Sequence, residues 1–391
     1  MKKIGILTFH RSINYGAFVQ SLALSDRIQK ALPDTKVEVI DYTSLVMEKI
    51  YKPKLTLRGV LNKGLYFKLL KRQKAFKSSL KYLPLSDKTI ISDESGEVFR
   101  YITENYDAVI VGSDAVFNWT KRGFPNPYIL NIESDIPRLS YAASAYGMEK
   151  ESITKEQLDI FGKSLGGFKF VGVRDDYTKD LTLSANPNIN PVYTCDPTVL
   201  LDMDYVQQLL GKTKEQVISD IKKKFGISSN KRVIGLMLGN QAIGAKIREK
   251  YSKDYEIVCL YQYLRDTKFL YSLTPLEWAL CFSMFSVTVT SYFHGTLLSL
   301  KNLTPTVSVD ITSFSVNNTG KIEDLLTRMD LCDNYFHLSN EKQNNFDGIL
   351  TRVDQMLANK SAEAERIKLG LEKIEPSFDA FLDVLKQQIQ E

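Results

Sequence analysis

Short runs of apolar residues alternate with amphipathic segments along most of the chain. The runs at residues 3–9, 107–114 and 168–173 are rich in Val, Ile and Phe and have the length of buried parallel strands. The segments between them place apolar residues three or four positions apart, as an amphipathic helix does. Because neighbouring parallel strands need a helical crossover, this alternation predicts an α/β fold.

The alternation restarts after residue 230. Strand-like runs at 232–240, 255–262, 286–295 and 304–310 are again separated by helical segments. Two series of this length predict two Rossmann-like domains that face each other across a cleft. We expect an N-terminal domain at 1–202, a helical linker at 203–230, a C-terminal domain at 231–345, and helices at 346–391 that can pack back on the first domain, with a break at Pro376.

Residues 287–310 have the pattern of a strand, a tight turn, a short helix and a second strand, with His294 at the turn. Gly295 lets the backbone turn closely before the helix. A helix start at the carboxyl edge of a parallel sheet offers unpaired amides and the positive end of a helix dipole. Because the His294 imidazole lies beside this helix start, the stretch predicts a site for an anionic ligand that needs a proton. A core or capping role for His294 is the alternative.

Polar residues also follow the strands of the first series. They are Asn14, Tyr15 and Gly16 after the first strand, and Gly112, Ser113 and Asp114 at the end of the strand at 107–114. The first group can equally be turn chemistry, and it does not match the G-x-G-x-x-G pattern of a dinucleotide site. Arg174 follows the strand at 168–173, where its planar guanidinium can bind phosphate or carboxylate, or can pair with Asp175 or Asp176.

Residues 52–81 carry ten Lys or Arg residues and no acidic residue, interleaved with Leu, Val and Phe. This basic amphipathic pattern has two interpretations. It is either a solvated helical face, or a surface that contacts an anionic membrane or an anionic acceptor.

Composition narrows the class of protein. With 391 residues, 43% hydrophobic content and a net charge of +5, the chain is globular, and its mild charge favours anionic ligands without requiring nucleic acid. No apolar run approaches the roughly 20 residues of a membrane span, and the first ten residues lack a signal-peptide pattern, so we expect a cytoplasmic protein. Three His and four Cys residues without clustered spacing argue against a metal site.

Six segments together resemble the polysaccharide pyruvyl transferase family, in order and spacing, over residues 3–331. They are GILTFHRSINYGAFVQSLAL, YDAVIVGSDAVFNW, SYAASAYG, VGVRDDYT, CDPTVLLD and SYFHGTLLSLKNLTPTV. The resemblance implies a fold like that of the two-domain GT-B glycosyltransferases. It also implies transfer of the enolpyruvyl group of phosphoenolpyruvate to two hydroxyls of one sugar, which leaves a pyruvate ketal and releases phosphate.

The resemblance further implies roles for single residues. His294 matches a general acid, Arg174 and Lys321 match phosphoenolpyruvate-binding cations, and the backbone at Phe293 and Gly295 matches a phosphate contact. The N-terminal domain becomes the acceptor side, with Asn14, Tyr15, Gly16, Gly112 and Ser113 as acceptor-binding candidates, and the C-terminal domain becomes the donor side.

Two positions depart from the family pattern. Tyr292 stands where some members have arginine. Ala115 stands at the glutamine position of the common GSDQ motif, so this chain has GSDA there. The resemblance implies no cofactor beyond the donor substrate. The expected acceptor is a lipid-linked or nucleotide-linked sugar used for exopolysaccharide or capsule synthesis, at the inner face of the membrane if residues 52–81 make a peripheral contact.

The residue types agree with this chemistry. Phosphoenolpyruvate is a small polyanion that cations and a helix N-terminus can hold, and protonation of its methylene carbon by a histidine creates a centre that a sugar hydroxyl attacks. Asp114 is a candidate base for that hydroxyl, or a structural strand-end residue. Two other functions stay open: a GT-B glycosyltransferase that uses a nucleotide sugar, and a noncatalytic sugar- or anion-binding protein of the same fold.

Overall fold

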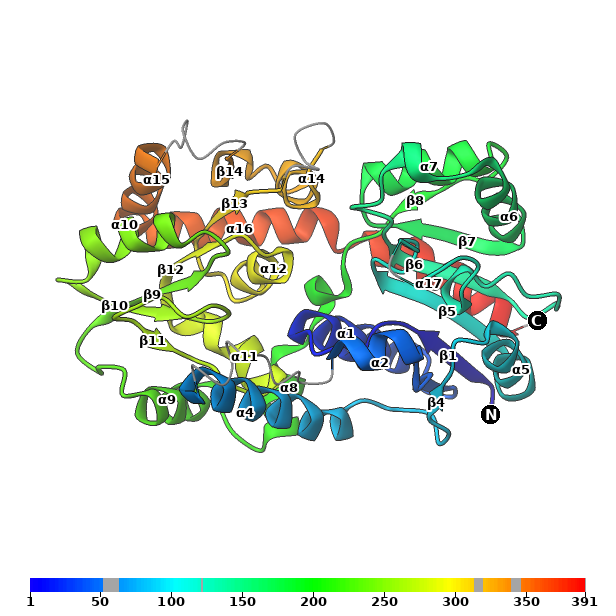
Figure 1. Ribbon diagram of the computed structural model, residues 1–391, viewed down its shortest axis with the longest axis horizontal. Coiled ribbons are helices and arrows are strands. Elements are labelled where there is room, and N and C mark those ends of the chain that lie inside the picture. The colour runs from blue at the N-terminus through cyan, green and yellow to red at the C-terminus, as the bar shows by residue number, and fades with distance from the viewer. Residues whose placement is uncertain (52–62, 121, 313–318, 339–345, 391) are drawn as a thin grey trace. The chain divides into compact units, whose positions relative to one another are not determined.

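The structure is a computed structural model that describes residues 1–51, 63–120, 122–312, 319–338 and 346–390 (Figure 1). Within these residues the strands form two parallel sheets of six strands each, and a separate pair is formed by β3 (Tyr42–Thr43) and β4 (Ile90–Ile91). Helices or 3₁₀ turns lie between most consecutive strands of both sheets, whereas the strands Tyr255–Cys259 and Lys268–Phe269 are joined without a helix. The predicted α/β class with two Rossmann-like domains is therefore confirmed.

The first sheet has the strand order β2-β1-β5-β6-β7-β8. Its strands are β1 (Lys3–Leu7), β2 (Lys36–Val39), β5 (Ala108–Asp114), β6 (Arg138–Ala143), β7 (Phe168–Val173) and β8 (Val192–Tyr193). The chain leads from β1 to β2 on one side and from β5 to β6, β7 and β8 on the other. The point where this direction switches lies between the carboxyl ends of β1 and β5, which is where open α/β sheets bind ligands.

Helices pack with this sheet because the central strands are buried on both faces. They are α1 (Tyr15–Ala31), α2 (Leu45–Tyr51), α5 (Ser95–Asn105), α6 (Lys155–Leu165), α7 (Asp176–Ala185) and α17 (Ser377–Gln390), with the short 3₁₀ turns η1 (Leu80–Tyr82), η2 (Pro127–Ile129), η3 (Lys150–Ser152) and η4 (Pro197–Leu200). Local sequence sets several starts: α6 opens with a capping box in which Thr154 and Gln157 bond each other's backbone amides.

The second sheet has the strand order β11-β10-β9-β12-β13-β14. Its strands are β9 (Arg232–Met237), β10 (Tyr255–Cys259), β11 (Lys268–Phe269), β12 (Phe285–Thr290), β13 (Thr306–Asp310) and β14 (Tyr335–His337). Here the chain leads from β9 to β10 on one side and from β12 to β13 on the other. The switch point therefore lies between the carboxyl ends of β9 and β12.

The helices around the second sheet include two that start with capping boxes, Thr213 with Gln216 and Thr274 with Glu277. They are α4 (Lys63–Ser79), α8 (Met203–Leu210), α9 (Lys214–Phe225), α10 (Gln241–Tyr251), α11 (Pro275–Cys281), α12 (Phe293–Lys301), α14 (Lys321–Arg328), α15 (Phe346–Ala358) and α16 (Lys360–Ile374), with the 3₁₀ turns η5 (Phe282–Met284) and η6 (Cys332–Asn334). None of the described helices is long and apolar enough to cross a bilayer.

The chain divides into two compact units whose boundaries differ from the predicted domains. Unit 1 takes its described residues from Met1–Lys54, Leu80–Leu201 and Glu375–Glu391, and unit 2 takes them from Leu55–Ser79 and Asp202–Ile374. Helices α8 and α9, in the predicted linker, pack on α11 of unit 2. Of the C-terminal helices, α15 and α16 belong to unit 2, whereas α17 packs on β7 of unit 1, where Ser377 Oγ accepts a hydrogen bond from the Cys195 amide at 2.9 Å.

The predicted basic insertion belongs to unit 2 over residues 63–79 and to unit 1 over its last two residues, while residues 52–62 lie outside the described residues. Cation–π contacts fasten α4 to unit 2. Lys68 Nζ lies 5.5 Å from the centroid of the Tyr263 ring, and the Arg72 guanidinium lies 4.5 Å from that of Tyr261. Lys71 and Lys74 are exposed. The segment is therefore partly a packing surface and partly a solvated one.

Candidate functional site

His294 is the second residue of α12, directly after the carboxyl end of β12 at the switch point of the second sheet. Among the described residues, the N-cap Tyr292 makes no side-chain capping bond at the start of α12. The imidazole is half-buried. The structure thus brings together a titratable ring and the positive end of a helix, as the sequence predicted for this stretch.

Gly295 has a different role from the predicted one. It lies inside α12 and not in a tight turn. A Cβ atom at this position would lie 2.4 Å from Thr290 Oγ1 and 2.9 Å from Met237 Sδ. Glycine is therefore needed because α12 packs closely against the ends of β9 and β12.

Lys321 approaches the same helix end from another element. It is the first residue of α14, and its Nζ lies 5.5 Å from the centroid of the Phe293 ring. A cation in the first turn of a helix is disfavoured by the helix dipole. An anion bound beside Phe293 and His294 would relieve this repulsion. We call Phe293, His294, Gly295 and Lys321 the unit 2 cluster.

Sequence reasoning missed a second cation near this cluster. The Tyr261 and Tyr292 rings lie 4.6 Å apart, and Arg72 of α4 stacks on Tyr261. Burial raises the pKa of the Tyr292 hydroxyl, and the neighbouring Tyr261 raises it further. A hydrogen bond from Gln262 and the charge of Arg72 lower this pKa by less, so its net shift is upward. Tyr292 thus stays neutral while Arg72 supplies positive charge nearby. No local signal in the sequence joins residues 72, 261 and 292.

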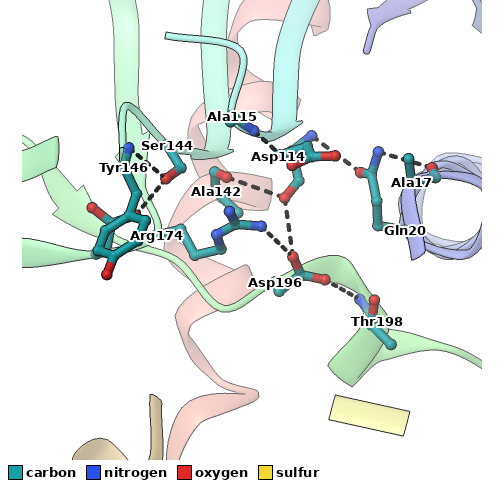
Figure 2. A network of polar contacts seen from close by, with 12 residues as sticks. Ala17, Gln20, Asp114, Ala115, Ala142, Ser144, Tyr146, Arg174, Asp196 and Thr198 are labelled. Carbon is teal, nitrogen blue, oxygen red and sulfur yellow. Dashed lines mark hydrogen bonds and ion pairs between the residues drawn. The ribbon is translucent and has the colours of Figure 1, made fainter. Parts of the chain in front are cut away.

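Arg174 lies in unit 1, in a buried network (Figure 2). Its Nη1 donates to Asp196 Oδ2 at 2.8 Å, so Asp196 is an ion-pair partner that sequence proximity did not suggest. Asp175 caps α7, where its Oδ1 accepts from the Thr178 amide at 2.8 Å. Burial lowers the pKa of the Arg174 guanidinium, but the neighbouring carboxylates, Asp196 first, raise it by more.

The same network encloses the predicted acceptor residues of β5. Ser113 Oγ donates to the carbonyl of Ala142 at 3.1 Å and lies 3.3 Å from Asp196 Oδ2, and its amide donates to Gln20 Oε1 at 3.2 Å. A Cβ atom on Gly112 would lie 2.1 Å from the carbonyl oxygen of Tyr141. The structure therefore places both residues inside unit 1, where they pack β5 against β6.

The predicted residues of the first turn lie at the start of α1. Asn14 is exposed and caps the helix, with its Oδ1 accepting from the Gly16 amide at 3.0 Å. Tyr15 and Gly16 are buried. Turn and cap chemistry thus accounts for Asn14 without a ligand, and a role in acceptor binding stays a prediction.

Asp114 has the most unusual backbone of the predicted site residues. It ends β5 at a φ of 79°, a region that residues other than glycine seldom adopt. Its Oδ1 accepts from the Ala115 amide at 2.8 Å (Figure 2). Such strain is concentrated at functional sites. The partly exposed carboxylate at the switch point of the first sheet is therefore a better candidate for chemistry than Ser113.

Sequence reasoning also missed a polar cluster around His10, after the end of β1. His10 is fully buried, with Nε2 2.8 Å from Asp41 Oδ1 and Nδ1 3.3 Å from the carbonyl of Thr8. Burial raises the pKa of Asp41, but hydrogen bonds from Arg11, His10 and Thr89 lower it by more, so it lies well below its usual range. Because both ring nitrogens have hydrogen-bond partners and the ring is fully buried, His10 stabilises the loop after β1.

A pocket of about 320 Å³ opens in unit 1 beside this loop, and we call it the unit 1 pocket. Its lining includes Tyr42, Asp93, Arg122, Asn126 and Tyr128. The Arg122 guanidinium lies 3.7 Å from the Phe9 ring centroid, and its Nη1 donates to the carbonyl of Asn118 at 3.0 Å. Aromatic rings beside fixed charged groups can stack on a sugar ring and bond its hydroxyls. In the described residues, no group of three or more His, Cys, Asp or Glu side chains could hold a metal ion.

Solved structures resemble the chain over nearly its whole length. UDP-GlcNAc 2-epimerase from Neisseria meningitidis, bound to UDP-GlcNAc, has a TM-score of 0.61 and 11% identity, with 99% of this chain and 100% of that chain covered. A putative UDP-N-acetylglucosamine 2-epimerase from Listeria monocytogenes has a TM-score of 0.56 and 11% identity, with 98% and 95% covered. A variant of the wall teichoic acid polymerase TagF has a TM-score of 0.52 and 9% identity, with 100% and 89% covered. These likenesses define the fold as that of the GT-B enzymes.

The comparison with curated proteins gives no match. The model of the polysaccharide pyruvyl transferase family matches residues 14–313, and the chain belongs to this family. The resemblance that six short segments suggested is thereby confirmed.

Proposed function

We propose that the protein transfers the pyruvyl group of phosphoenolpyruvate to two hydroxyls of one sugar during synthesis of a cell-surface polysaccharide. The observation that carries this proposal is the unit 2 cluster, in which a half-buried imidazole begins a helix beside the Lys321 ammonium. Membership in the polysaccharide pyruvyl transferase family supports the same reaction class.

The unit 2 cluster suits the donor. The first-turn amides of α12 and the Lys321 ammonium can bind the phosphate of phosphoenolpyruvate by charge-assisted hydrogen bonds. Arg72 adds a long-range attraction for the trianion through its place on Tyr261. His294 can then donate a proton, because an imidazole titrates near neutral pH.

The reaction balances with these groups. His294 gives its proton to the methylene carbon of phosphoenolpyruvate, which forms the methyl group and leaves an oxocarbenium-like carbon. One sugar hydroxyl attacks this carbon and gives its proton to Asp114, the proposed base. Exchange with water returns a proton to the imidazole and removes one from Asp114 before the next turnover. The second hydroxyl then displaces phosphate, to which its proton is lost, and the ketal closes. Cations and helix amides stabilise the phosphate as it leaves.

Unit 1 supplies candidates for the acceptor. We propose that the unit 1 pocket holds a sugar ring of a lipid-linked or nucleotide-linked acceptor, with Tyr42 or Tyr128 against its apolar face and Arg122 and Asp93 at its hydroxyls. Asp114, at the switch point of the same sheet, is the proposed base. Ser113 and Gly112 support it by fixing β5.

The test is release of inorganic phosphate from phosphoenolpyruvate with a panel of lipid-linked and nucleotide-linked sugars. We expect release that depends on one acceptor, with a product heavier than that acceptor by one pyruvate less one water. Release of a nucleoside diphosphate from a nucleotide sugar, without consumption of phosphoenolpyruvate, would identify a glycosyltransferase. Sugar binding that occurs without turnover of either donor would identify a noncatalytic protein.

A further inference from the structure

The amino-terminal edge of the second sheet carries a cavity of about 440 Å³. We call it the basal pocket; its lining includes Lys222, Lys231, Arg232, Ser286, Leu357 and Lys360. Arg232 opens β9 and Ser286 is the second residue of β12. His294 follows the other end of β12, so the basal pocket and the unit 2 cluster lie at opposite edges of one sheet. The pocket is large enough for a small organic ligand.

The charge of the basal pocket is one-sided. Four of its lining residues are cations and none is acidic. Within the described residues, these cations contact carbonyls and a ring. Lys231 Nζ donates to the carbonyls of Ser252 and Lys253 at 3.2 and 3.0 Å, and Lys360 Nζ donates to that of Phe285 at 3.4 Å. The Arg232 guanidinium lies 4.6 Å from the centroid of the Tyr255 ring. Carbonyls and a ring orient these charges without neutralising them.

Two of the cations that line the pocket, Arg232 and Lys360, repel each other. Partial burial lowers the pKa of Lys360, and the charge of Arg232 lowers it further. Lys360 is also the first residue of α16, a helix of 15 residues, so its ammonium lies at the positive end of the dipole. Acidic residues are favoured at this position, and an ammonium next to a guanidinium is disfavoured twice. An anion in the pocket would remove both repulsions.

The lining also contains apolar surface. Its apolar lining residues are Leu357, Met284 and Val233. A bare inorganic ion would leave this surface exposed to water, whereas the organic part of a larger anion would cover it. The pocket therefore suits a molecule with a polyphosphate group and an organic body.

From the cavity, its cations and its apolar floor, we propose that the basal pocket is a second ligand site, which binds a soluble small molecule that carries a diphosphate group. This site is separate from the unit 2 cluster and does not depend on the proposed function.

The experiment measures binding of inorganic pyrophosphate to the full chain by isothermal titration calorimetry. The pocket variant is Arg232→Gln with Lys360→Gln. The matched control is Lys223→Gln with Lys253→Gln, which removes the same charge from exposed lysines that do not line the pocket. The pocket variant and the control are both also made in a Lys321→Ala background, which weakens anion binding at the unit 2 cluster and leaves the basal pocket intact.

In the Lys321→Ala background we expect pyrophosphate to bind, more tightly than inorganic phosphate, and the pocket variant to lose affinity by roughly tenfold or more while the control keeps it. Equal affinities in the pocket variant and the control would overturn the proposal, and so would loss of all pyrophosphate binding through Lys321→Ala alone. If the double pocket variant does not fold, the single change of the exposed Lys360 to Gln gives the same comparison.

A lipid headgroup could present similar phosphate chemistry. Vesicles that contain phosphatidylglycerol are therefore tested with the same proteins. We expect pocket and control variants to bind these vesicles equally, because a soluble ligand is proposed. Vesicle binding that the pocket variant alone loses, together with no pyrophosphate binding, would assign the pocket to a membrane and overturn the proposal.

Discussion

At the scale of single residues, His294 is proposed to donate a proton and Lys321 to supply positive charge for the donor. Both touch the start of α12, one from inside the helix and one across the Phe293 ring. An acid lowers the barrier of the chemical step, whereas a distant cation mainly stabilises the bound polyanion. Substitution of each should therefore change a different kinetic constant.

We predict that His294→Gln lowers kcat by roughly 10²- to 10⁴-fold with little change in donor affinity, because the amide keeps a polar group but cannot donate a proton to carbon. Lys321→Ala should instead raise the KM for phosphoenolpyruvate by roughly 10- to 100-fold. Steady-state phosphate release measures both, and His337→Gln, on β14, is the control. A His294→Gln protein within a few-fold of the wild-type rate would remove His294 as the acid.

Arg174 poses a separate question, because its ion pair is buried and its predicted donor contact is untested. We predict that Asp196→Asn destabilises the protein by roughly 3 kcal/mol, since it leaves a buried guanidinium uncompensated. Adding Arg174→Gln should recover part of this loss, which urea unfolding measures.

The folded double variant then tests donor binding apart from stability. If Arg174 binds phosphoenolpyruvate, the KM for the donor rises in the double variant while the protein stays folded. An unchanged KM would show that Arg174 only holds the loop at Asp196 against β7.

At the scale of elements, Glu38 joins the edge of the first sheet to its neighbours. This carboxylate on β2 is 2% exposed and pairs with Lys3 of β1 and Lys36, while Tyr106 donates to it at 3.1 Å. Burial raises the pKa of Glu38, but these three hydrogen bonds lower it by more, so the net shift is downward. The charged form therefore stabilises the fold.

We predict that Glu38→Gln costs about 1.5 to 3 kcal/mol at pH 7. A carboxylate with a lowered folded-state pKa contributes its full stability above the unfolded value of about 4.3 and loses it as pH falls through the lower folded value. The difference between wild type and variant should thus be constant from pH 8 to 6 and shrink below about pH 4.5. Urea unfolding followed by circular dichroism measures it, and a difference that grows on acidification would contradict the pairing.

At the scale of the whole molecule, the exposed side of α4 bears on where the protein works. Phe67 and Leu69 are 60% and 49% exposed, and Lys71 and Lys74 are exposed beside them, whereas Lys68 and Arg72 stack on tyrosines of unit 2. Exposed aromatic and basic residues on one helix favour contact with an anionic membrane surface. The helix would thereby bring the enzyme to a lipid-linked acceptor.

We predict that Lys71→Gln with Lys74→Gln weakens binding to anionic vesicles at low salt by roughly 30-fold, at about 1 kcal/mol per basic residue near the surface. Vesicle sedimentation measures the partition. Lys163→Gln with Lys169→Gln, two exposed lysines of unit 1, is the charge-matched control. Equal partition of the two variants would leave α4 as a solvated face.

Much of the architecture was predictable because the signals are local. Periods of two and 3.6 residues, and caps such as Thr154 with Gln157, lie within a few positions of one another. His294 could be assigned to a helix start at a strand end for the same reason, and the order of six short segments led to the correct family. The α/β class and the place of His294 at the start of α12 therefore follow from neighbouring residues.

What the tertiary structure decided depends on contacts between distant positions, which no local period encodes. Arg174 pairs with Asp196, 22 positions away, Arg72 reaches Tyr261, and Ser377 bonds α17 to the Cys195 amide of unit 1. The basal pocket draws Lys222, Arg232 and Lys360 from three elements, each of which reads as an ordinary surface cation in its own segment. Packing alone determines such partners, because burial and charge act across space whatever the separation along the chain.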